Sequence, residues 1–241
     1  MRSEKAIFKI GGTILENPIY LKNTFTQLHQ LVLENFFKAI IVIPGGGSYA
    51  NFVREIDKEL NIGDTIAHWM AIYTMNYNGY IIRQNYPSII LIEKIDDLKT
   101  ADQAISLFLP FKYLKKNDPL PHSWDVTSDS ITLYIAHKLD LRECFLIKDV
   151  DGIIDRNGGV IQNLTSSLYL QMKKSGKLAK IDAKVNELKQ SKPIDKYTLE
   201  LIDNYKLSCT LLNGAVKESR IFQYFSNIDH SEKTYTKISF L

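Results

Sequence analysis

The stretch KAIIVIPGGGSYANFVREID, residues 38–57, passes from an unbroken apolar run through three glycines into an amphipathic helical pattern. This order predicts a buried strand, a tight loop and a helix. Backbone N–H groups of such a loop and of the helix N-terminus attract an anion. We therefore expect Gly45, Gly46 and Gly47 to bind an anionic group, with Arg54 supplying a bidentate contact. A plain strand–helix turn and a surface arginine are the alternatives.

A second glycine loop follows the first apolar run, in AIFKIGGTILE, residues 6–16. Lys9 stands two residues before Gly11 and Gly12, so an ammonium accompanies backbone that a ligand can approach closely. This combination suits a phosphate. The spacing of a P-loop, with four residues between its glycines and then Lys-Ser/Thr, is absent here. The sequence therefore predicts a phosphate site of another design.

Apolar runs and helical patterns alternate along the chain. Six apolar runs read as strands, at residues 6–10, 39–43, 88–92, 105–109, 144–150 and 208–212. Six helical patterns lie at residues 18–36, 48–60, 65–84, 128–139, 197–205 and 217–225. Short apolar strands that alternate with helices predict an α/β fold with a mostly parallel sheet covered on both faces. Ligands bind such sheets beyond the carboxyl ends of the strands, where both glycine loops fall.

Two further segments place carboxylates near the ends of predicted elements. In HSWDVTSDSITLYIAHKLD, Asp129 falls in the first turn of a helix, where the helix dipole favours a negative charge. In CFLIKDVDGIID, a buried strand ends with Lys148, Asp149, Asp151 and Gly152. The carboxylates there can serve a nucleotide or Mg²⁺, or form an ordinary Asp-Gly turn. For Asp129 the alternative is a simple capping role.

Size and composition are those of a soluble globular protein. The 241 residues suit one large α/β domain or two lobes around a shared core. A net charge of +3 is too small to indicate nucleic acid or membrane binding. Apolar stretches stay well short of the roughly 20 residues that span a bilayer. We expect a cytoplasmic protein in which Cys144 and Cys209 are buried free thiols, with a bridge between them left open.

In this order and spacing, the four segments resemble the amino acid kinase superfamily. The resemblance covers essentially the whole chain, from Lys-x-Gly-Gly through Gly-Gly-Gly, Ser-Asp and Asp-Val-Asp-Gly-Ile to a last strand in TYTKI, residues 234–238. It implies a three-layer αβα sandwich with a mostly parallel central sheet, the carbamate kinase-like fold. It also implies one domain over residues 1–241, with an acceptor-binding lobe at about 1–125 and a nucleotide-binding lobe at about 126–241.

The superfamily resemblance implies an ATP-dependent kinase of small molecules, with Mg²⁺ held mainly by ATP oxygens and no metal site on the protein. Phosphoryl transfer depends on positioning and on cations and N–H donors around the γ-phosphate. Catalytic roles then fall to Lys9 and to Asp129, which orients the lysine. The implied nucleotide-binding residues are Gly11, Gly12, Lys148, Asp149, Asp151 and Gly152. The implied acceptor-binding residues are Gly45, Gly46, Gly47, Asn51, Arg54, His122 and Trp124.

Within the superfamily, the glycine loop, the HSW turn and DVDGIID resemble the archaeal-type kinases of methanofuran biosynthesis. These add a second phosphate to an aminomethylfuran phosphate, which implies a phosphomonoester acceptor and a diphosphate product. The indole of Trp124 would then stack on the furan ring beside His122. The alternative is a packed tryptophan with a capping histidine. Isopentenyl phosphate, UMP or a carboxylate as acceptor stays open, as does a nucleotide-binding storage or regulatory protein of this fold.

Lys148 departs from the superfamily pattern, in which threonine usually stands at this position. Relatives also often supply a second lysine from a Gly-Gly-Met segment that this sequence does not contain. We hypothesise that Lys148 contacts ATP phosphates and partly replaces that charge. The alternative is an exposed lysine at a strand end.

The helical pattern HWMAIYTMNYNGYII is apolar on most sides and offers an interface. The resemblance implies a homo-oligomer, a dimer or larger. His68, within this pattern, is expected to be a core or interface histidine. The lysine-rich segment 173–196 reads as a solvated loop and helix, with a role at the nucleotide site as the less favoured interpretation.

Overall fold

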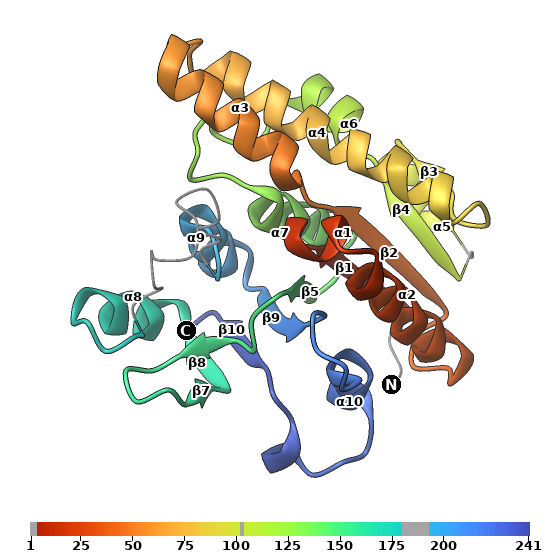
Figure 1. Ribbon diagram of the computed structural model, residues 1–241, viewed down its shortest axis with the longest axis vertical. Coiled ribbons are helices and arrows are strands. Elements are labelled where there is room, and N and C mark those ends of the chain that lie inside the picture. Colours follow the sequence, from red (N-terminus) through yellow and green to blue (C-terminus); the bar gives the residue numbers. More distant parts are fainter. Residues whose placement is uncertain (1–3, 102–103, 180–192) are drawn as a thin grey trace.

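A central sheet of eight strands organises the computed structural model, which describes residues 4–101, 104–179 and 193–241 (Figure 1). Its strands are β1 (Lys5–Ile10), β2 (Ala39–Pro44), β3 (Ile90–Ile92), β4 (Ile105–Phe108), β5 (Glu143–Lys148), β8 (Asn163–Thr165), β9 (Ser208–Asn213) and β10 (Thr236–Ser239). Their order across the sheet is β3-β4-β2-β1-β5-β9-β10-β8. Every neighbouring pair in this sheet is parallel except β9 and β10.

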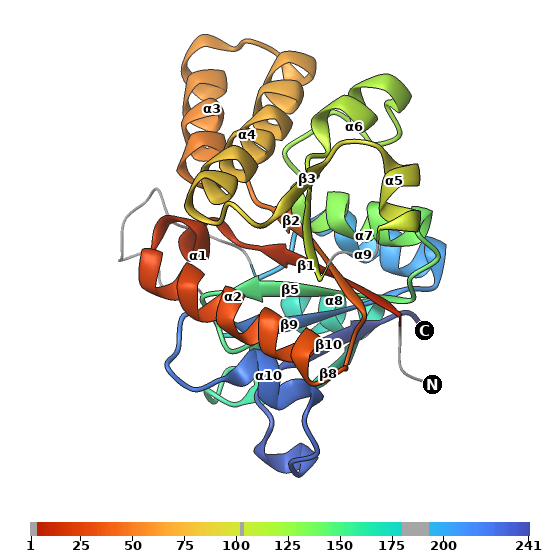
Figure 2. The ribbon, with the colours of Figure 1, turned by 90° about the vertical axis from the view of Figure 1, so that its right-hand side faces the viewer.

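Helices cover both faces of the sheet (Figure 2). On one face pack α2 (Pro18–Leu33) and α10 (Arg220–Phe225), and on the other α7 (Ser128–Lys138) and α9 (Lys196–Tyr205). Two further helices, α3 (Gly47–Leu60) and α4 (Asp64–Asn85), pack against each other as a hairpin that follows β2. The shorter elements are α1 (Gly12–Glu16), α5 (Ile95–Thr100), α6 (Phe111–Asn117), α8 (Ser166–Lys174), the 3₁₀ helix η1 (His230–Glu232) and a hairpin of β6 (Ile153–Ile154) and β7 (Val160–Ile161).

The predicted three-layer αβα arrangement is confirmed, and each predicted strand and helix forms at its expected place. Differences lie at the ends: the strand predicted at 144–150 stops at Lys148, and the helix predicted at 217–225 begins only at Arg220. The sequence missed α1, α5, α6, α8 and the strands β6 to β8. These elements are too short to display a repeat of their own period.

Side chains on β1 alternate between the two faces of the sheet, and this alternation places Lys9. Phe8 is fully buried in the core beneath α2 and α10, where it stacks on Phe145 with ring centroids 4.8 Å apart. Because successive strand residues point to opposite faces, Lys9 faces α7 instead. One strand thus anchors the core on one side and supplies an ammonium on the other.

The cysteines lie opposite each other on parallel strands, Cys144 on β5 and Cys209 on β9. Both are buried and free, as the sequence predicts, and no bridge joins them. Burial raises the pKa of both thiols well above their ordinary value. They therefore behave as small apolar core residues.

None of the helices in the described ranges has both the length and the apolar character needed to cross a bilayer. Most of the lysine-rich segment 173–196 lies outside the described residues, at 180–192. Its two ends are described, because Lys174 closes α8 and Lys196 begins α9.

Replacing Phe8 by alanine should reveal how much the core depends on this ring. Because Phe8 is fully buried among aromatic neighbours, we expect Phe8→Ala to lower the free energy of unfolding by about 3–5 kcal/mol, as measured by urea denaturation. Phe240→Ala is the control, since that side chain is 38% exposed. Equal stabilities of the two variants would contradict the packing argument.

Candidate active site

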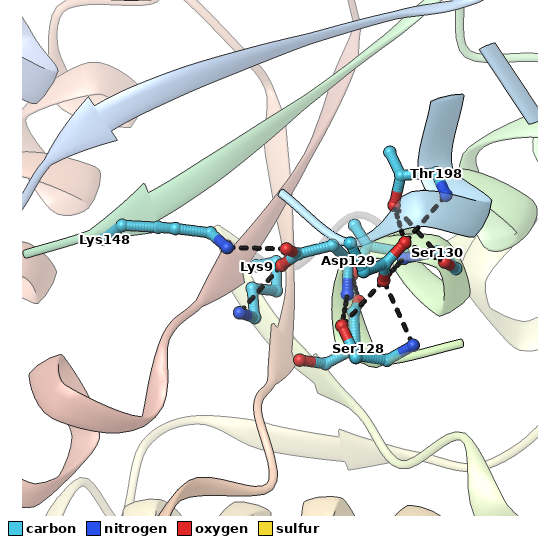
Figure 3. Close-up of polar contacts among 9 residues, drawn as sticks. Lys9, Ser128, Asp129, Ser130, Lys148 and Thr198 are labelled. Carbon is cyan, nitrogen blue, oxygen red and sulfur yellow. Dashed lines mark hydrogen bonds and ion pairs between the residues drawn. The ribbon is translucent and has the colours of Figure 1, made fainter. Parts of the chain in front are cut away.

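Two lysines and one aspartate meet where β1, β5 and α7 converge (Figure 3). Lys9 Nζ lies 2.9 Å from Asp129 Oδ1, and Lys148 Nζ donates to Asp129 Oδ2 at 2.5 Å. The side chains of Lys9, Lys148 and Asp129 are only 7%, 8% and 3% exposed. Each carboxylate oxygen thus faces its own ammonium, and the group forms a buried cluster of two cations and one anion.

Burial and the opposite charges within this cluster have opposing effects on the pKa values of Asp129 and Lys9. Burial alone would raise the pKa of Asp129, but the charges of Lys148 and Lys9 outweigh it and lower the pKa to about 2. Burial also lowers the pKa of Lys9, and the charge of Lys148 adds to this, while Asp129 opposes both. The carboxylate is therefore ionised at neutral pH and serves as a counter-charge for the lysines.

The two glycine loops touch each other through their backbones. A Cβ on Gly12 would lie 2.6 Å from Gly47 Cα, which no real contact permits. Gly11 donates its N–H to Ile147 O at 2.8 Å, and Gly45 donates to Ile10 O at 2.9 Å, so both loops continue from their strands. The sequence predicts that these glycines lie at one edge of the sheet, and the structure brings them into contact.

The N-terminus of α3 already holds a carboxylate of the chain itself. Glu16, at the end of α1, accepts a hydrogen bond from the N–H of Ser48. A Cβ on Gly47 would lie 2.6 Å from Glu16 Oε1, and Gly47 has a φ of +59°, a conformation that glycine adopts without strain. One of the amides expected for an anionic ligand is thus occupied by Glu16 in this structure.

Three of the predicted acceptor residues lie together on α3 and the segment before α7. The guanidinium carbon of Arg54 lies 4.5 Å from the ring centroid of Trp124. Asn51 Oδ1 accepts a long hydrogen bond from Arg54 Nη1 at 3.4 Å, and Trp124 Nε1 donates to Asp57 Oδ2 at 2.8 Å. The indole is therefore held at its edge by a carboxylate and at its face by a cation.

His122 belongs to a neighbouring cluster and contacts other partners. Its ring nitrogens lie 2.9 Å from Thr65 Oγ1 and 2.8 Å from Asp118 Oδ1, and its ring stacks on His68 at 4.4 Å between centroids. Burial, with the nearby His122, lowers the pKa of His68 to about 4, so that imidazole is neutral at pH 7. His68 is buried, as the sequence predicts.

At the other side of the cluster, the Asp-Val-Asp-Gly motif follows β5. Asp149 is half-buried. Asp151 Oδ1 accepts from Asn213 Nδ2 at 2.6 Å and from Arg220, and these partners lower the pKa of Asp151 against the effect of burial. Gly152 has a φ of +140°, which explains the glycine there. Lys148 is buried, so the alternative of an exposed lysine at this strand end is wrong.

Sequence reasoning missed four side chains that hold the site together: Glu16, Asp57, Asp195 and Arg220. Asp57 carried a usable signal, because it stands one turn after Arg54 on the same predicted helix. Asp195 precedes a predicted helix and could have been recognised as its cap. Glu16 and Arg220 each contact a residue far away in the sequence, and no local sequence pattern predicts such contacts.

Replacing Asp129 by asparagine leaves two buried ammonium groups without their shared counter-charge. We expect Asp129→Asn to lower the free energy of unfolding at pH 7 by about 3–5 kcal/mol. Burial lowers the pKa of Lys9, and Asp129 opposes this effect. Without Asp129 the pKa of Lys9 in the folded variant falls further below its value in the unfolded chain, which therefore binds more protons at alkaline pH. The stability of the variant should therefore rise from about pH 7 to about pH 10 relative to wild type.

The acid side gives the complementary result. In the wild type the Asp129 contribution is present above about pH 4 and is lost as pH falls toward the folded-state pKa of about 2. Asp129→Asn should lack this acid loss in urea denaturation at a series of pH values. Asp125→Asn is the control, because its ion pair with Lys196 is exposed. Parallel stability–pH curves for the wild type and Asp129→Asn would refute the buried-cluster assignment.

Comparison with known proteins identifies the family. The amino acid kinase family matches residues 4–213. The chain is 34% identical over 238 residues to the [5-(aminomethyl)furan-3-yl]methyl phosphate kinase of Methanocaldococcus jannaschii, and the match covers 96% of each chain.

Solved structures of UMP kinases share the fold. The enzyme from Ureaplasma parvum superimposes with a TM-score of 0.65 at 16% identity, covering 99% of this chain and 100% of that one. The enzyme from Bacillus anthracis gives a TM-score of 0.67 at 15% identity, covering 98% and 96%. At such identities the likeness establishes the fold alone.

Proposed function

The chain belongs to the amino acid kinase family and is a phosphotransferase, and we propose that it transfers the γ-phosphoryl group of ATP to a phosphomonoester, giving a diphosphate. The acceptor we favour is an aminomethylfuran phosphate in methanofuran-type cofactor biosynthesis, after the name of the Methanocaldococcus relative. The observation that carries the proposal is the buried cluster of Lys9, Asp129 and Lys148.

The charge of this cluster suits phosphoryl transfer. Two ammonium groups share one carboxylate, so the cluster is cationic, and it lies beside two glycine loops whose backbones touch. Cations and N–H donors of this kind stabilise charge on the equatorial oxygens of a transferring phosphoryl group. With its low pKa, Asp129 orients the lysines and needs no basic role, because a phosphate acceptor is already an ionised nucleophile.

In this proposal Lys148 is the second cation for the phosphates of ATP. Its ammonium comes from the end of β5, next to β1, which carries Lys9. The same carboxylate holds both lysines, so the pair is preorganised before ATP arrives. Lys148 thereby supplies the charge that relatives take from a Gly-Gly-Met segment.

The acceptor would lie beside the second glycine loop, which touches the first through Gly12 and Gly47. In this proposal the loop of Gly45, Gly46 and Gly47 supplies backbone, Arg54 supplies a guanidinium, and Trp124, whose ring centroid lies 4.5 Å from that guanidinium, supplies an aromatic surface. Cations at two separate strand ends favour two separate anions, one from ATP and one from the acceptor. We propose that His122 lines this side less directly, through its contact with α4. The acceptor lobe would span about residues 1–125.

The nucleotide would lie over the lobe of about residues 126–241, against Gly11, Gly12 and the Asp149–Gly152 turn. Mg²⁺ would be held chiefly by ATP oxygens. Around Lys9 and Lys148 the site offers cations and backbone amides, which are ligands for phosphate.

Other acceptors are the second candidate. UMP is one of them, because UMP kinases share this fold, although a shared fold does not rank UMP above the other acceptors. Isopentenyl phosphate and a carboxylate are the other alternative acceptors. If no acceptor is phosphorylated, the alternative is a storage or regulatory protein that binds nucleotide without transferring phosphate.

We also propose that the chain forms a homodimer through α4. The exposed apolar side chains of this helix follow alternate steps of four and three residues: Ile66, Met70, Tyr73, Tyr77 and Tyr80. Such spacing forms a helix-packing seam. An antiparallel second copy centred on Tyr73 would bring Asp64 of one copy toward Arg83 of the other. Analytical sedimentation tests this interface. We expect the Tyr73→Asp variant to sediment as a monomer and the Ile19→Asp variant, changed on α2, to sediment as the wild type does. A monomeric wild type would refute the interface.

Truncating Arg54 tests the acceptor side. Arg54 is exposed in this structure, and loss of a charge-assisted contact that a bound acceptor would cover and desolvate costs about 2–5 kcal/mol. Arg54→Ala should therefore reduce kcat/KM for the acceptor by about 30-fold or more, with ATP binding little changed. Arg54→Lys keeps the charge without the planar fork and should recover only part of the loss. Arg142→Ala is the control, because Arg142 is exposed and lies away from α3 and α4.

The measurement is ADP release with furan phosphate, isopentenyl phosphate, UMP and carboxylate acceptors. Efficient use of a carboxylate or a neutral alcohol, with the phosphomonoesters inert, would overturn the proposed acceptor class. If the enzyme phosphorylates UMP and not furan phosphate, the acceptor is still a phosphomonoester, and only its proposed identity is wrong.

Truncating Lys148 tests the phosphoryl side. Removing one preorganised donor to developing charge typically costs about 100- to 1,000-fold in kcat. We expect a loss of this order for Lys148→Met, because its ammonium is buried beside Asp129 and its removal leaves Lys9 to neutralise the phosphates without its partner. Lys174→Met, on the exposed face of α8, is the matched control. Unchanged turnover and ATP affinity in Lys148→Met would remove this role.

A further inference from the structure

Asp195 accepts six hydrogen bonds although it is almost fully buried, at 5% exposure. Its Oδ2 accepts from Thr127 N at 3.0 Å, from Thr127 Oγ1 at 2.7 Å and from Ser130 N at 3.1 Å. Its Oδ1 accepts from Ser130 Oγ at 2.5 Å and from Thr198 N and Oγ1, both at 2.7 Å. Thus one carboxylate binds donors of two helices.

These bonds join the N-termini of α7 and α9. Asp195 caps α9, as its bond from the Thr198 N–H indicates, and at the same time it takes the free donors of the first turn of α7. Capping of a single helix uses one or two donors. The additional bonds hold α7 in a fixed position against α9.

The first turn of α7 is the turn that carries Asp129. Thr127 and Ser130 flank it in sequence, and their donors go to Asp195. The carboxylate of Asp129 points away from them, toward Lys9 and Lys148; Figure 3 shows the lysines on one side of Asp129 and the hydroxyls of Ser130 and Thr198 on the other. The two faces of one helical turn are thus held by two different sets of contacts.

We propose that Asp195 is a positioning residue for phosphoryl transfer, which fixes the first turn of α7 so that Asp129 holds both lysines in place. The inference rests on the proposed function, since it assigns Lys9 and Lys148 to the phosphates. Asp195 itself touches neither lysine and acts through α7.

Charge supports the same role. The ionisable groups that bear on Lys9 are Asp129, Lys148 and, more weakly, Asp195. Burial and Lys148 lower the pKa of Lys9, and the two carboxylates raise it. Removal of the negative charge of Asp195 should therefore make Lys9 lose its proton at a lower pH.

The test compares Asp195→Asn with two other variants. Asparagine keeps one acceptor oxygen and removes the charge. Ser130→Ala leaves the carboxylate and removes one of its donors, and it serves if Asp195→Asn does not fold. Asp203→Asn is the matched control, because Asp203 lies on α9 and accepts from Ser166 Oγ of α8 at 2.6 Å, away from α7.

We expect Asp195→Asn to lower kcat for aminomethylfuran phosphate by about 10- to 100-fold, the scale of a small misplacement of catalytic groups. The KM for ATP should change less than about twofold, and the alkaline limb of the pH–rate profile should move to lower pH. Asp203→Asn should show neither effect. If Asp195→Asn loses stability but keeps kcat and the pH profile of the wild type, Asp195 is only a helix cap and the inference fails.

A second readout separates this inference from the proposed function. If the wild type phosphorylates none of the acceptors, the proposed function fails, and positioning is then read by amide hydrogen exchange of residues 127–133. Exchange of this segment should be faster in Asp195→Asn and Ser130→Ala than in Asp203→Asn at equal global stability. Equal exchange rates in all three variants would overturn the positioning role.

Discussion

The rest of this structure depends on one buried carboxylate shared by two ammonium groups. Lys9 and Lys148 are nearly inaccessible to water, and a buried cation is tolerated only when a counter-charge accompanies it. Asp129 supplies that charge at 2.9 Å and 2.5 Å. The strands β1 and β5 must therefore be neighbours, and α7 must begin at their carboxyl ends. The parallel order of the sheet satisfies both conditions.

Two close approaches keep this cluster in register with the surrounding loops. The glycine loops after β1 and β2 meet backbone to backbone, where any side chain on Gly12 would collide with Gly47. On the opposite side, Asp195 binds the donors of α7 that Asp129 leaves unused. The fold thus fixes the cationic cluster from two directions, by packing of bare backbone and by a network of hydrogen bonds.

The proposed acceptor side, with Arg54, Trp124 and Asp57, is arranged differently from the buried cluster. Its charged and aromatic groups are more accessible, and they are ordered by each other: Asp57 holds the indole of Trp124, and the indole faces Arg54. Glu16 binds the Ser48 amide in the first turn of α3, so an internal carboxylate sits where an external anion was expected. In the proposed reaction, the preorganised buried cluster would bind the phosphoryl group that is transferred, and the more open polar surface would bind the acceptor.

The sequence by itself determined the layers of the fold and most of the polar groups at the candidate active site. Continuous apolar strands that alternate with amphipathic helices leave few arrangements other than a covered parallel sheet, and strand ends collect the ligands of such a sheet. Lys9, both glycine loops and Asp129 could be selected on that basis. Short elements such as α1 and α8 could not, because they contain too few residues to show a period.

Only the tertiary structure decided which of these groups meet. Lys148 is an exposed lysine or a buried cation depending on whether β5 lies beside β1, and no local pattern records strand order. The same holds for Glu16 on the N-terminus of α3 and for Arg220 on Asp151, whose partners lie far away along the chain. Sequence periodicity reports the face on which a side chain lies, whereas its charge partner is set by the packing of distant segments.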